Sequence, residues 1–154
     1  PFSEWQIRNI HQLILKNIDD DNAGRYRQQN VLISGATSTP PDYTLLNEKM
    51  AQLVDWYNSE AHKLHPIERG AKVHADFVGI HPFIDGNGRT SRLLMNLELL
   101  KAGYPPCVIT VENRLAYYED LDQWMAYGKT EPFINLVSEA VLEGFKPYQV
   151  VLGI

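Results

Sequence analysis

Apolar residues recur every three or four positions through most of this 154-residue chain, and that spacing is the feature that most limits its fold. The first segment begins behind Ser3, a residue type that caps helix N-termini, and the polar run DDDNAG closes it. We therefore expect a helix over residues 3–18, whose buried face is formed by Ile7, Ile10, Ile14 and Ile18.

Five more segments have the same helical spacing, at 44–58, 66–80, 88–102, 113–127 and 131–145. Pro66 suits the first turn of one helix, and Gly103 with Pro105 ends the next. The expected buried positions are Leu46, Met50, Leu53 and Tyr57, then Ile67, Ala71, His74 and Val78, then Leu93, Leu97 and Leu100. Because no repeat or interdomain linker interrupts the pattern, the sequence predicts one all-α domain over residues 1–154.

One short segment does not follow the helical pattern. Val31, Leu32 and Ile33 are consecutive β-favouring or apolar residues, and Gly, Ala, Ser, Thr and Pro follow them. This composition predicts a short strand and a turn, which would form a small exposed β-hairpin at about residues 30–40.

Bulk composition argues against several classes of partner and of site. The formal charge of −5 disfavours nucleic acid and membrane surfaces, which are anionic. The single cysteine cannot form an internal disulfide, no Cys/His cluster has zinc-finger spacing, and no apolar run is long enough to span a membrane. We expect a cytoplasmic location by default, although the chain begins at Pro1 rather than Met and an upstream signal or anchor stays open.

The most unusual segment is HPFIDGNGRTSR, residues 81–92. Pro82 disfavours helical backbone at His81, so the preceding helix should end there and a loop should begin. The sequence DGNG then supplies two glycines around Asn87, which suits a nest of inward-pointing N–H groups, and the loop leads directly into a helix. A nest at a helix N-terminus is a site for phosphate.

Charged residues around this loop support the same interpretation. Arg89 and Arg92 lie near the start of the helix, where the helix dipole disfavours cations unless an anion binds there. Asp85 would be repelled by that anion unless Mg²⁺ lies between them. His81 is then available as a general base toward a hydroxyl group, and the residues point to phosphate-group transfer from a Mg²⁺-bound nucleotide.

Each residue also has a structural explanation. Asp85 could be a helix N-cap, the glycines could be turn residues, and the two arginines could be a solvated surface pair. Only their coincidence within one segment favours the anion site. Elsewhere, His74 lies among apolar neighbours, so we interpret it as a hydrogen-bonded core histidine rather than a metal ligand.

The segment 81–92 fits the Fic family signature H-P-F-x-[D/E]-G-N-G-R-x-x-R at every defined position, and the chain is therefore similar to that family. The resemblance extends over nearly the whole chain, including NAGRYRQQNVLISG, which resembles the segment leading into the family's flap hairpin. Residues 64–106 resemble the central helices of Fic domains related to the metazoan endoplasmic-reticulum enzyme and its bacterial relatives. A Fic-type helical domain with a flap at about 30–40 is the implied fold.

The resemblance implies a protein adenylyltransferase that moves AMP from ATP to a Ser, Thr or Tyr hydroxyl of a target protein. By position, His81 would be the base and Asp85 would hold Mg²⁺. The phosphates would be bound by the loop 85–89 and the second arginine, that is by Gly86, Asn87, Gly88, Arg89 and Arg92. Phe83 would anchor the loop. Tyr117 or Tyr118 would line the adenine pocket, and at most one of them would face the base. The target protein would bind to the flap residues Leu32, Ile33, Ser34 and Gly35.

Several alternatives stay open at this point. The same site removes AMP in some relatives, other relatives transfer phosphocholine, and a catalytically silent nucleotide-binding module is a third alternative. Family members are often dimeric, and many are inhibited by a helix with the motif [S/T]-x-x-x-E-[G/N]. The nearest match, SEAVLEG, is offset by one residue, so we expect Glu143 to lie on an ordinary solvated helix. An inhibitory helix or antitoxin-like partner would then lie outside this chain.

Overall fold

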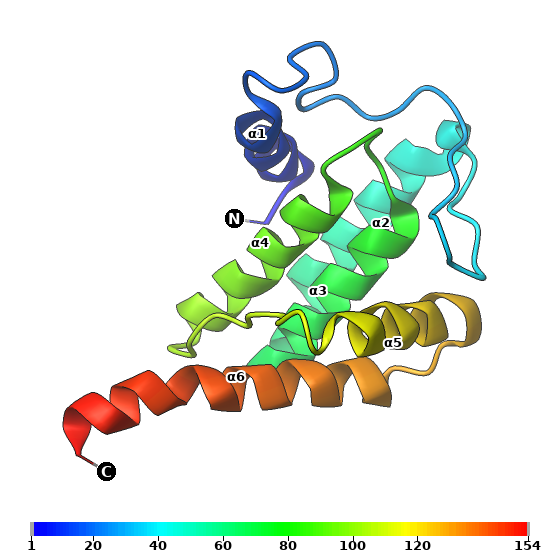
Figure 1. Ribbon diagram of the computed structural model, residues 1–154. Coiled ribbons are helices and arrows are strands. Elements are labelled where there is room, and N and C mark those ends of the chain that lie inside the picture. Colours follow the sequence, from blue (N-terminus) through cyan, green and yellow to red (C-terminus); the bar gives the residue numbers. More distant parts are fainter. Residues whose placement is uncertain (1, 154) are drawn as a thin grey trace.

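The computed structural model describes residues 2–153, and within that range helices are the only regular secondary structure (Figure 1). The helices are α1 (Glu4–Leu15), α2 (Leu46–Ser59), α3 (Pro66–Ile80), α4 (Asn87–Lys101), α5 (Arg114–Tyr127) and α6 (Glu131–Leu152), with short 3₁₀ turns η1 (Tyr43–Leu45) and η2 (Ala61–Lys63). None of these described helices is both long and apolar enough to cross a membrane. The all-α prediction is confirmed, and most helix bounds lie close to the predicted ones. The exceptions are α1, which ends three residues early, and α6, which continues seven residues beyond the predicted end at residue 145 and includes Pro147.

Two central helices, α3 and α4, share the most extensive contact in the fold and run side by side (Figure 1). Helix α3 begins at a capping box, in which His65 Nδ1 accepts from the Ile67 N–H and Glu68 accepts from the His65 N–H, with Pro66 in the first turn. The loop 81–86 joins the end of α3 to the start of α4. The signature loop is therefore held between the two best-packed helices.

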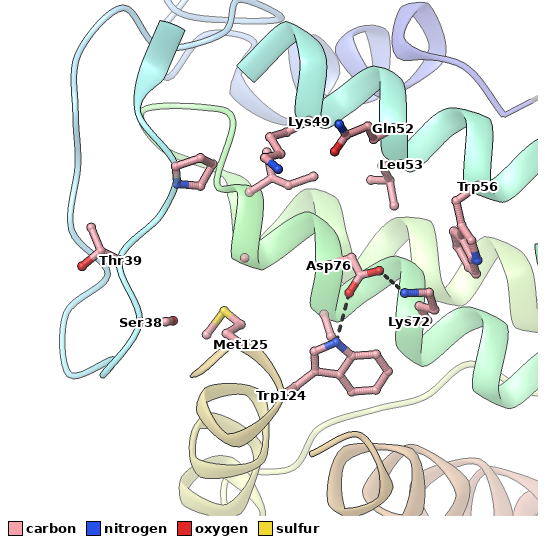
Figure 2. A pocket seen from close by; sticks show the side chains of 14 residues that line it. Ser38, Thr39, Lys49, Gln52, Leu53, Trp56, Lys72, Asp76, Trp124 and Met125 are labelled. Atoms are coloured by element: carbon pink, nitrogen blue, oxygen red, sulfur yellow. Dashed lines mark hydrogen bonds and ion pairs between the residues drawn. The ribbon is translucent and has the colours of Figure 1, made fainter. Parts of the chain in front are cut away.

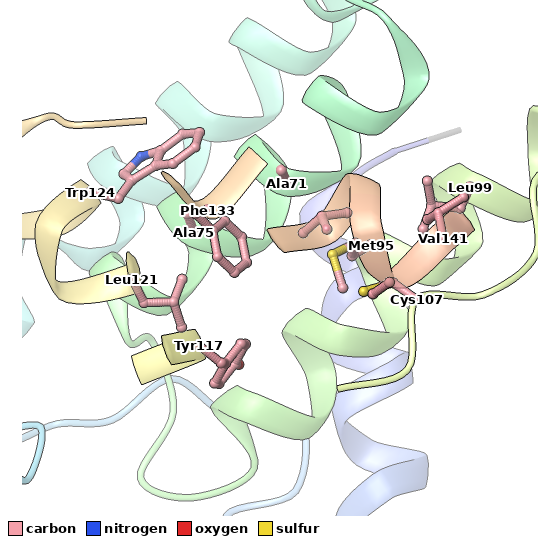
Figure 3. Close-up of a cluster of buried hydrophobic side chains, with 12 residues drawn as sticks. Ala71, Ala75, Met95, Leu99, Cys107, Tyr117, Leu121, Trp124, Phe133 and Val141 are labelled. Atoms are coloured by element: carbon pink, nitrogen blue, oxygen red, sulfur yellow. The ribbon is translucent and has the colours of Figure 1, made fainter. Parts of the chain in front are cut away.

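Two hydrophobic clusters hold the helices together. One lies where α5 and α6 cover α3 and α4, and Figure 3 shows Phe133, Trp124 and Tyr117 converging there with Met95 and Leu99. The other joins α1, α2 and α3 with the middle of α4, and Phe83 of the signature loop is completely buried in it. Because Phe83 packs in this core, the backbone of the loop is tied to the body of the domain, as expected for this residue.

Helix α4 buries a different face from the one predicted, and α1 agrees with the prediction only in part. In α1, Ile7 is completely buried as predicted and Ile10 packs against a core cluster, but the other buried residues are His11 and Leu15. Ile18 lies beyond the helix end and is 65% exposed. In α4 the buried face carries Leu94, Met95, Glu98 and Leu99, while Leu93 and Leu100 are exposed. The segment LLMNLELL is apolar on several faces, so periodicity does not identify its buried one. The faces of α2 and α3 agree with the prediction.

The predicted β-hairpin flap is absent from the described chain. Residues 29–41 form an irregular loop, with a turn in which the Ala36 N–H donates to the Ile33 carbonyl at 3.1 Å. Pro40 and Pro41 in the returning half have no N–H to donate, and the Thr37 N–H donates instead to Asp122 on α5 at 2.7 Å. An isolated pair of strands is marginal in water, and in the returning half several donors that a ladder would need are missing or already used.

Candidate active site

His81 ends α3 in the left-handed conformation, at φ 51°, ψ 57°. Its ring Nδ1 lies 3.2 Å from the Val78 carbonyl oxygen, an atom that can only accept, so the proton is on Nδ1 and the lone pair is on Nε2. Burial lowers the pKa of His81, the bond to Val78 opposes that effect, and the positive charge of Arg27 lowers the pKa further. His81 is therefore a half-buried neutral imidazole with a free basic nitrogen.

Asn87 fastens the signature loop from inside. Its side-chain amide donates to the Phe83 carbonyl at 2.8 Å and accepts from the Phe83 N–H at 3.0 Å, and the residue is 3% exposed. Both ends of this amide are thus used within the loop. Asn87 can contribute to anion binding through its backbone N–H and through the second hydrogen of its amide nitrogen.

Gly86 provides the turn into α4, with a left-handed φ of 81°. A Cβ atom at this position would lie 3.0 Å from Leu15 Cδ2 and 3.1 Å from His11 Nε2, so α1 packs directly against the loop. The first helical bond runs from the Thr90 N–H to the Gly86 carbonyl. The N–H groups of Asn87, Gly88 and Arg89 precede that bond and form the open, electropositive end of α4.

Asp85 is not the helix N-cap, because that position belongs to Gly86. Its Oδ1 accepts from the Gly86 N–H at 2.6 Å and its Oδ2 pairs with Arg89 Nη2 at 2.9 Å, while the side chain remains 64% exposed. The carboxylate and the guanidinium thus lie together at the mouth of the loop. An exposed ion pair of this kind contributes little stability and can rearrange around a ligand.

Arg92 forms no ion pair within the described residues and lies half-buried one turn beyond Arg89. One of its guanidinium nitrogens would be 3.4 Å from a Cβ on Gly88, so it lies over the open helix end. Its charge also reaches the buried Tyr117 phenol, where it opposes the rise in pKa that burial causes. The two signature arginines therefore flank the N-terminus of α4, as the sequence predicts.

The structure separates the two tyrosines proposed for adenine. Tyr117 is 4% exposed, and its hydroxyl lies 2.8 Å from Nε2 of the completely buried His74. Tyr118 is 53% exposed and lies under the Arg114 guanidinium. Tyr117 is therefore a core residue behind Arg92, and only Tyr118 has a ring face open to a ligand. The interpretation of His74 as a hydrogen-bonded core histidine is confirmed.

A cleft of 650 Å³ opens between α2, α3, α5 and the returning half of the flap (Figure 2). In its floor, Asp76 pairs with Lys72 at 2.5 Å and accepts from the Trp124 indole N–H at 3.0 Å. The cleft reaches Ile80, one residue before His81, but none of the signature residues lines it. The reactive groups of the signature loop therefore lie beside this cleft and not within it.

Glu143 lies far along α6 and is 66% exposed, where it pairs with Lys146 at 2.6 Å. The neighbouring Gly144 packs against Pro105 and Pro106, in the connection after the C-terminal end of α4. The signature arginines lie at the opposite end of that helix. This placement supports the expectation that Glu143 is a solvated surface residue.

Two supporting residues were missed in the sequence. His11 is completely buried, accepts the Gly24 N–H at Nδ1 (2.9 Å), stacks on Phe83 and bonds the Asp85 carbonyl through Nε2. Arg27 is 3% exposed, and its Nε donates to the His81 carbonyl at 2.8 Å. The only signal for His11 was its spacing of four residues from Ile7 and Leu15.

These features define an all-helical domain that combines an anion-binding helix N-terminus with a histidine base. Residues 1–99 match the Fic/DOC family, and the chain belongs to that family. It is 44% identical over 133 residues to a protein adenylyltransferase Fic of Nematostella vectensis and 40% identical over 134 residues to the protein adenylyltransferase fic-1 of Caenorhabditis briggsae. The alignments cover 86% of this chain but only 30% and 26% of those proteins.

A solved structure of Fic-1 residues 134–508 from C. elegans shares the fold, with a TM-score of 0.87 and 36% identity. That match covers 99% of this chain and 44% of the other. The chain thus spans less than half the length of these relatives.

Proposed function

We propose that this chain transfers AMP from ATP to a Ser, Thr or Tyr hydroxyl of a target protein. The observation that carries the proposal is the placement of His81. Its unprotonated Nε2 belongs to the same short loop that opens into the N-terminus of α4, where Arg89 and Arg92 lie. A base beside an anion site is the arrangement that attack of a hydroxyl on a phosphate requires. The names of the curated relatives support the adenylyl group as the one transferred.

The reaction uses the residues in a definite order. His81 Nε2 takes the proton from the target hydroxyl, and the oxygen forms a bond to the α-phosphorus of ATP. The bond from that phosphorus to the oxygen bridging to the β-phosphate breaks, and pyrophosphate leaves with the electron pair. Negative charge grows on the leaving group, where the N–H groups of Asn87, Gly88 and Arg89 and the two guanidinium groups stabilise it.

The residues at the loop fit Mg²⁺ as a cofactor. Asp85 offers an exposed carboxylate next to the anion site, and Mg²⁺ is commonly bound by one or two carboxylates together with substrate phosphates. No cluster of three or more His, Cys, Asp or Glu side chains suited to a metal occurs within residues 2–153, so a cage built by the protein alone is not offered there. When bound, Mg²⁺ would neutralise phosphate charge. Asp85 would hold the ion, and its ion pair with Arg89 would then be broken.

The flap contributes the target-binding surface in this proposal. Leu32 is 80% exposed, and Leu32 to Gly35 form an open loop. The Ile33 carbonyl already accepts from the Ala36 N–H, but the N–H groups of these four residues are available to an extended peptide. An added strand would supply the partner that the loop lacks when free. Recognition through backbone groups depends weakly on sequence, so the target's identity is set by other surfaces.

The test is transfer of label from α-³²P-ATP to protein, in a lysate and on the chain itself, with Mg²⁺ present. We expect label with the wild type, none with His81→Ala, and none from γ-³²P-ATP. Label from the γ-phosphate would identify a phosphotransferase instead. Binding of ATP without any transfer would favour the silent nucleotide-binding module, and the assay would then be repeated with a phosphocholine donor.

A further inference from the structure

Arg27 connects three separate parts of the backbone through one buried side chain. Its Nε donates to the His81 carbonyl at 2.8 Å, its Nη1 to the Gln29 carbonyl at 2.9 Å and its Nη2 to the Pro41 carbonyl at 2.6 Å. Its own N–H donates to the Pro82 carbonyl at 2.9 Å. Gln29 and Pro41 are the two ends of the flap loop 29–41. The flap and the residue that carries the base therefore meet on one guanidinium group.

Burying the Arg27 guanidinium costs free energy that its hydrogen bonds roughly offset, so stability alone does not explain it. Arg27 is 3% exposed and forms no ion pair with a carboxylate within the described residues. Burial lowers its pKa, an effect that the charge of Asp42 opposes. Removing a cation from water costs several kcal/mol, about as much as the hydrogen bonds return. A neutral side chain would avoid that cost, but only the planar guanidinium donates in three fixed directions at once.

The backbone conformation of His81 explains why its carbonyl needs the hydrogen bond from Arg27. A left-handed backbone at a residue other than glycine is strained and persists when neighbouring contacts fix it from several sides. The His81 N–H bonds the Phe77 carbonyl at 3.0 Å, its ring bonds Val78, and its carbonyl is held by Arg27. Of these three contacts, only the one to Arg27 comes from outside α3. Arg27 thus determines where the end of α3 lies relative to the flap.

We propose that Arg27 is a positioning residue that couples the flap to His81, so that a peptide held on the flap presents its hydroxyl to Nε2. The inference rests on the proposed adenylyl transfer for its functional consequence, but the coupling itself is a structural property. A displacement of about 1 Å between a base and its substrate is enough to reduce a rate about 100-fold. Because Arg27 touches no N–H group of α4, nucleotide binding does not depend on it in the same way.

The test compares Arg27→Gln and Arg27→Lys with Arg25→Gln, a matched control at an exposed arginine two residues away. Gln removes the charge and two of the three donors, and Lys keeps the charge but cannot bridge three carbonyls. Backbone hydrogen exchange is measured for residues 29–41 and 81–86, together with ATP affinity and AMP transfer. Circular dichroism verifies that each variant is folded, and if Gln does not fold the Lys variant carries the test.

With either Arg27 variant, we expect exchange to accelerate in both segments, transfer to fall about 100-fold and ATP affinity to stay within about threefold. The Arg25 control should change none of these. Exchange that accelerates in only one of the two segments, or in neither, overturns the coupling. If the wild type transfers no AMP, the proposed function fails, and the exchange measurement still decides whether flap and loop are coupled. Parallel loss of ATP binding and AMP transfer in the Arg27 variants would also overturn the positioning role of Arg27, because Arg27 would then act on the whole site.

Discussion

The Nε2 of His11 lies 2.8 Å from the backbone carbonyl oxygen of Asp85, a residue 74 positions later in the chain. The Gly24 N–H donates to the other ring nitrogen, so the proton of the neutral imidazole is on Nε2 and is donated to Asp85. Burial lowers the pKa of His11, which keeps the ring in this neutral form. Helix α1 therefore fixes the carbonyl that immediately precedes the turn at Gly86.

His11→Leu leaves a backbone donor and a backbone acceptor without partners. Each such loss costs about 1–3 kcal/mol, so we expect the free energy of unfolding to fall by about 2–4 kcal/mol in urea titrations. The control is His62→Leu, the same substitution at an exposed histidine, which should be nearly neutral. Equal effects at the two positions would mean that the His11 bonds contribute nothing measurable.

Gly86→Ala combines a left-handed backbone with a close contact. The strain of a positive φ costs about 1–2 kcal/mol for a residue with a Cβ. At Gly86, the added atom would also approach Leu15 and His11 at 3.0–3.1 Å, and either the loop or α1 must move. Gly128→Ala is the control, because its φ is 66° and no atom lies within 4 Å of the new Cβ. We expect AMP transfer to be lost in Gly86→Ala only, and an active Gly86→Ala enzyme would contradict the close packing.

The sequence predicted where the signature residues lie and missed the residues that support them. The signature residues are contiguous, so their place between two helices and at a helix N-terminus could be inferred from spacing. Arg27 and His11 act from positions 54 and 74 residues away from their partners, and no local pattern marks such a contact. The buried face of α1 was predicted only in part for a related reason, because it includes a histidine that a search for apolar spacing does not select.

Proline at Ile33 should separate target binding from nucleotide binding. The substitution removes the N–H of a flap residue and stiffens its backbone, while the anion site on α4 is untouched. We expect AMP transfer to protein to fall about tenfold or more, the result of losing main-chain pairing with the target. ATP affinity, measured by calorimetry, should not change. Equal losses in both would count against a target-binding role for the flap.

Glu143→Gly should leave activity essentially unchanged. The side chain is exposed, and its pair with Lys146 is a surface contact that contributes little. Gly within α6 costs about 1 kcal/mol relative to Ala, so thermal unfolding should shift slightly toward lower temperature. Automodification with α-³²P-ATP is the measurement. A large rise in label would mean that Glu143 restrains the site and that its position on α6 changes in the active protein.

His74 should make the stability of the fold depend on pH. Burial lowers its pKa to about 3, against an ordinary value of 6.5 in the unfolded chain. Between these values the unfolded state binds one more proton than the folded state, so stability is complete above pH 6.5 and decreases as the pH falls toward 3. The slope from one such proton is about 1.4 kcal/mol per pH unit.

The measurement is urea unfolding at several pH values between 7 and 4, comparing the wild type with His74→Gln. Glutamine can still bond the Tyr117 hydroxyl but does not titrate, so its free energy of unfolding should depend less steeply on pH. Carboxylates and His11 contribute to the pH dependence of unfolding in both proteins. The relevant quantity is therefore the difference between the two slopes. Identical slopes would show that His74 is not held neutral by the core. In that case its bond to Tyr117, behind Arg92, would have to form in the protonated state as well.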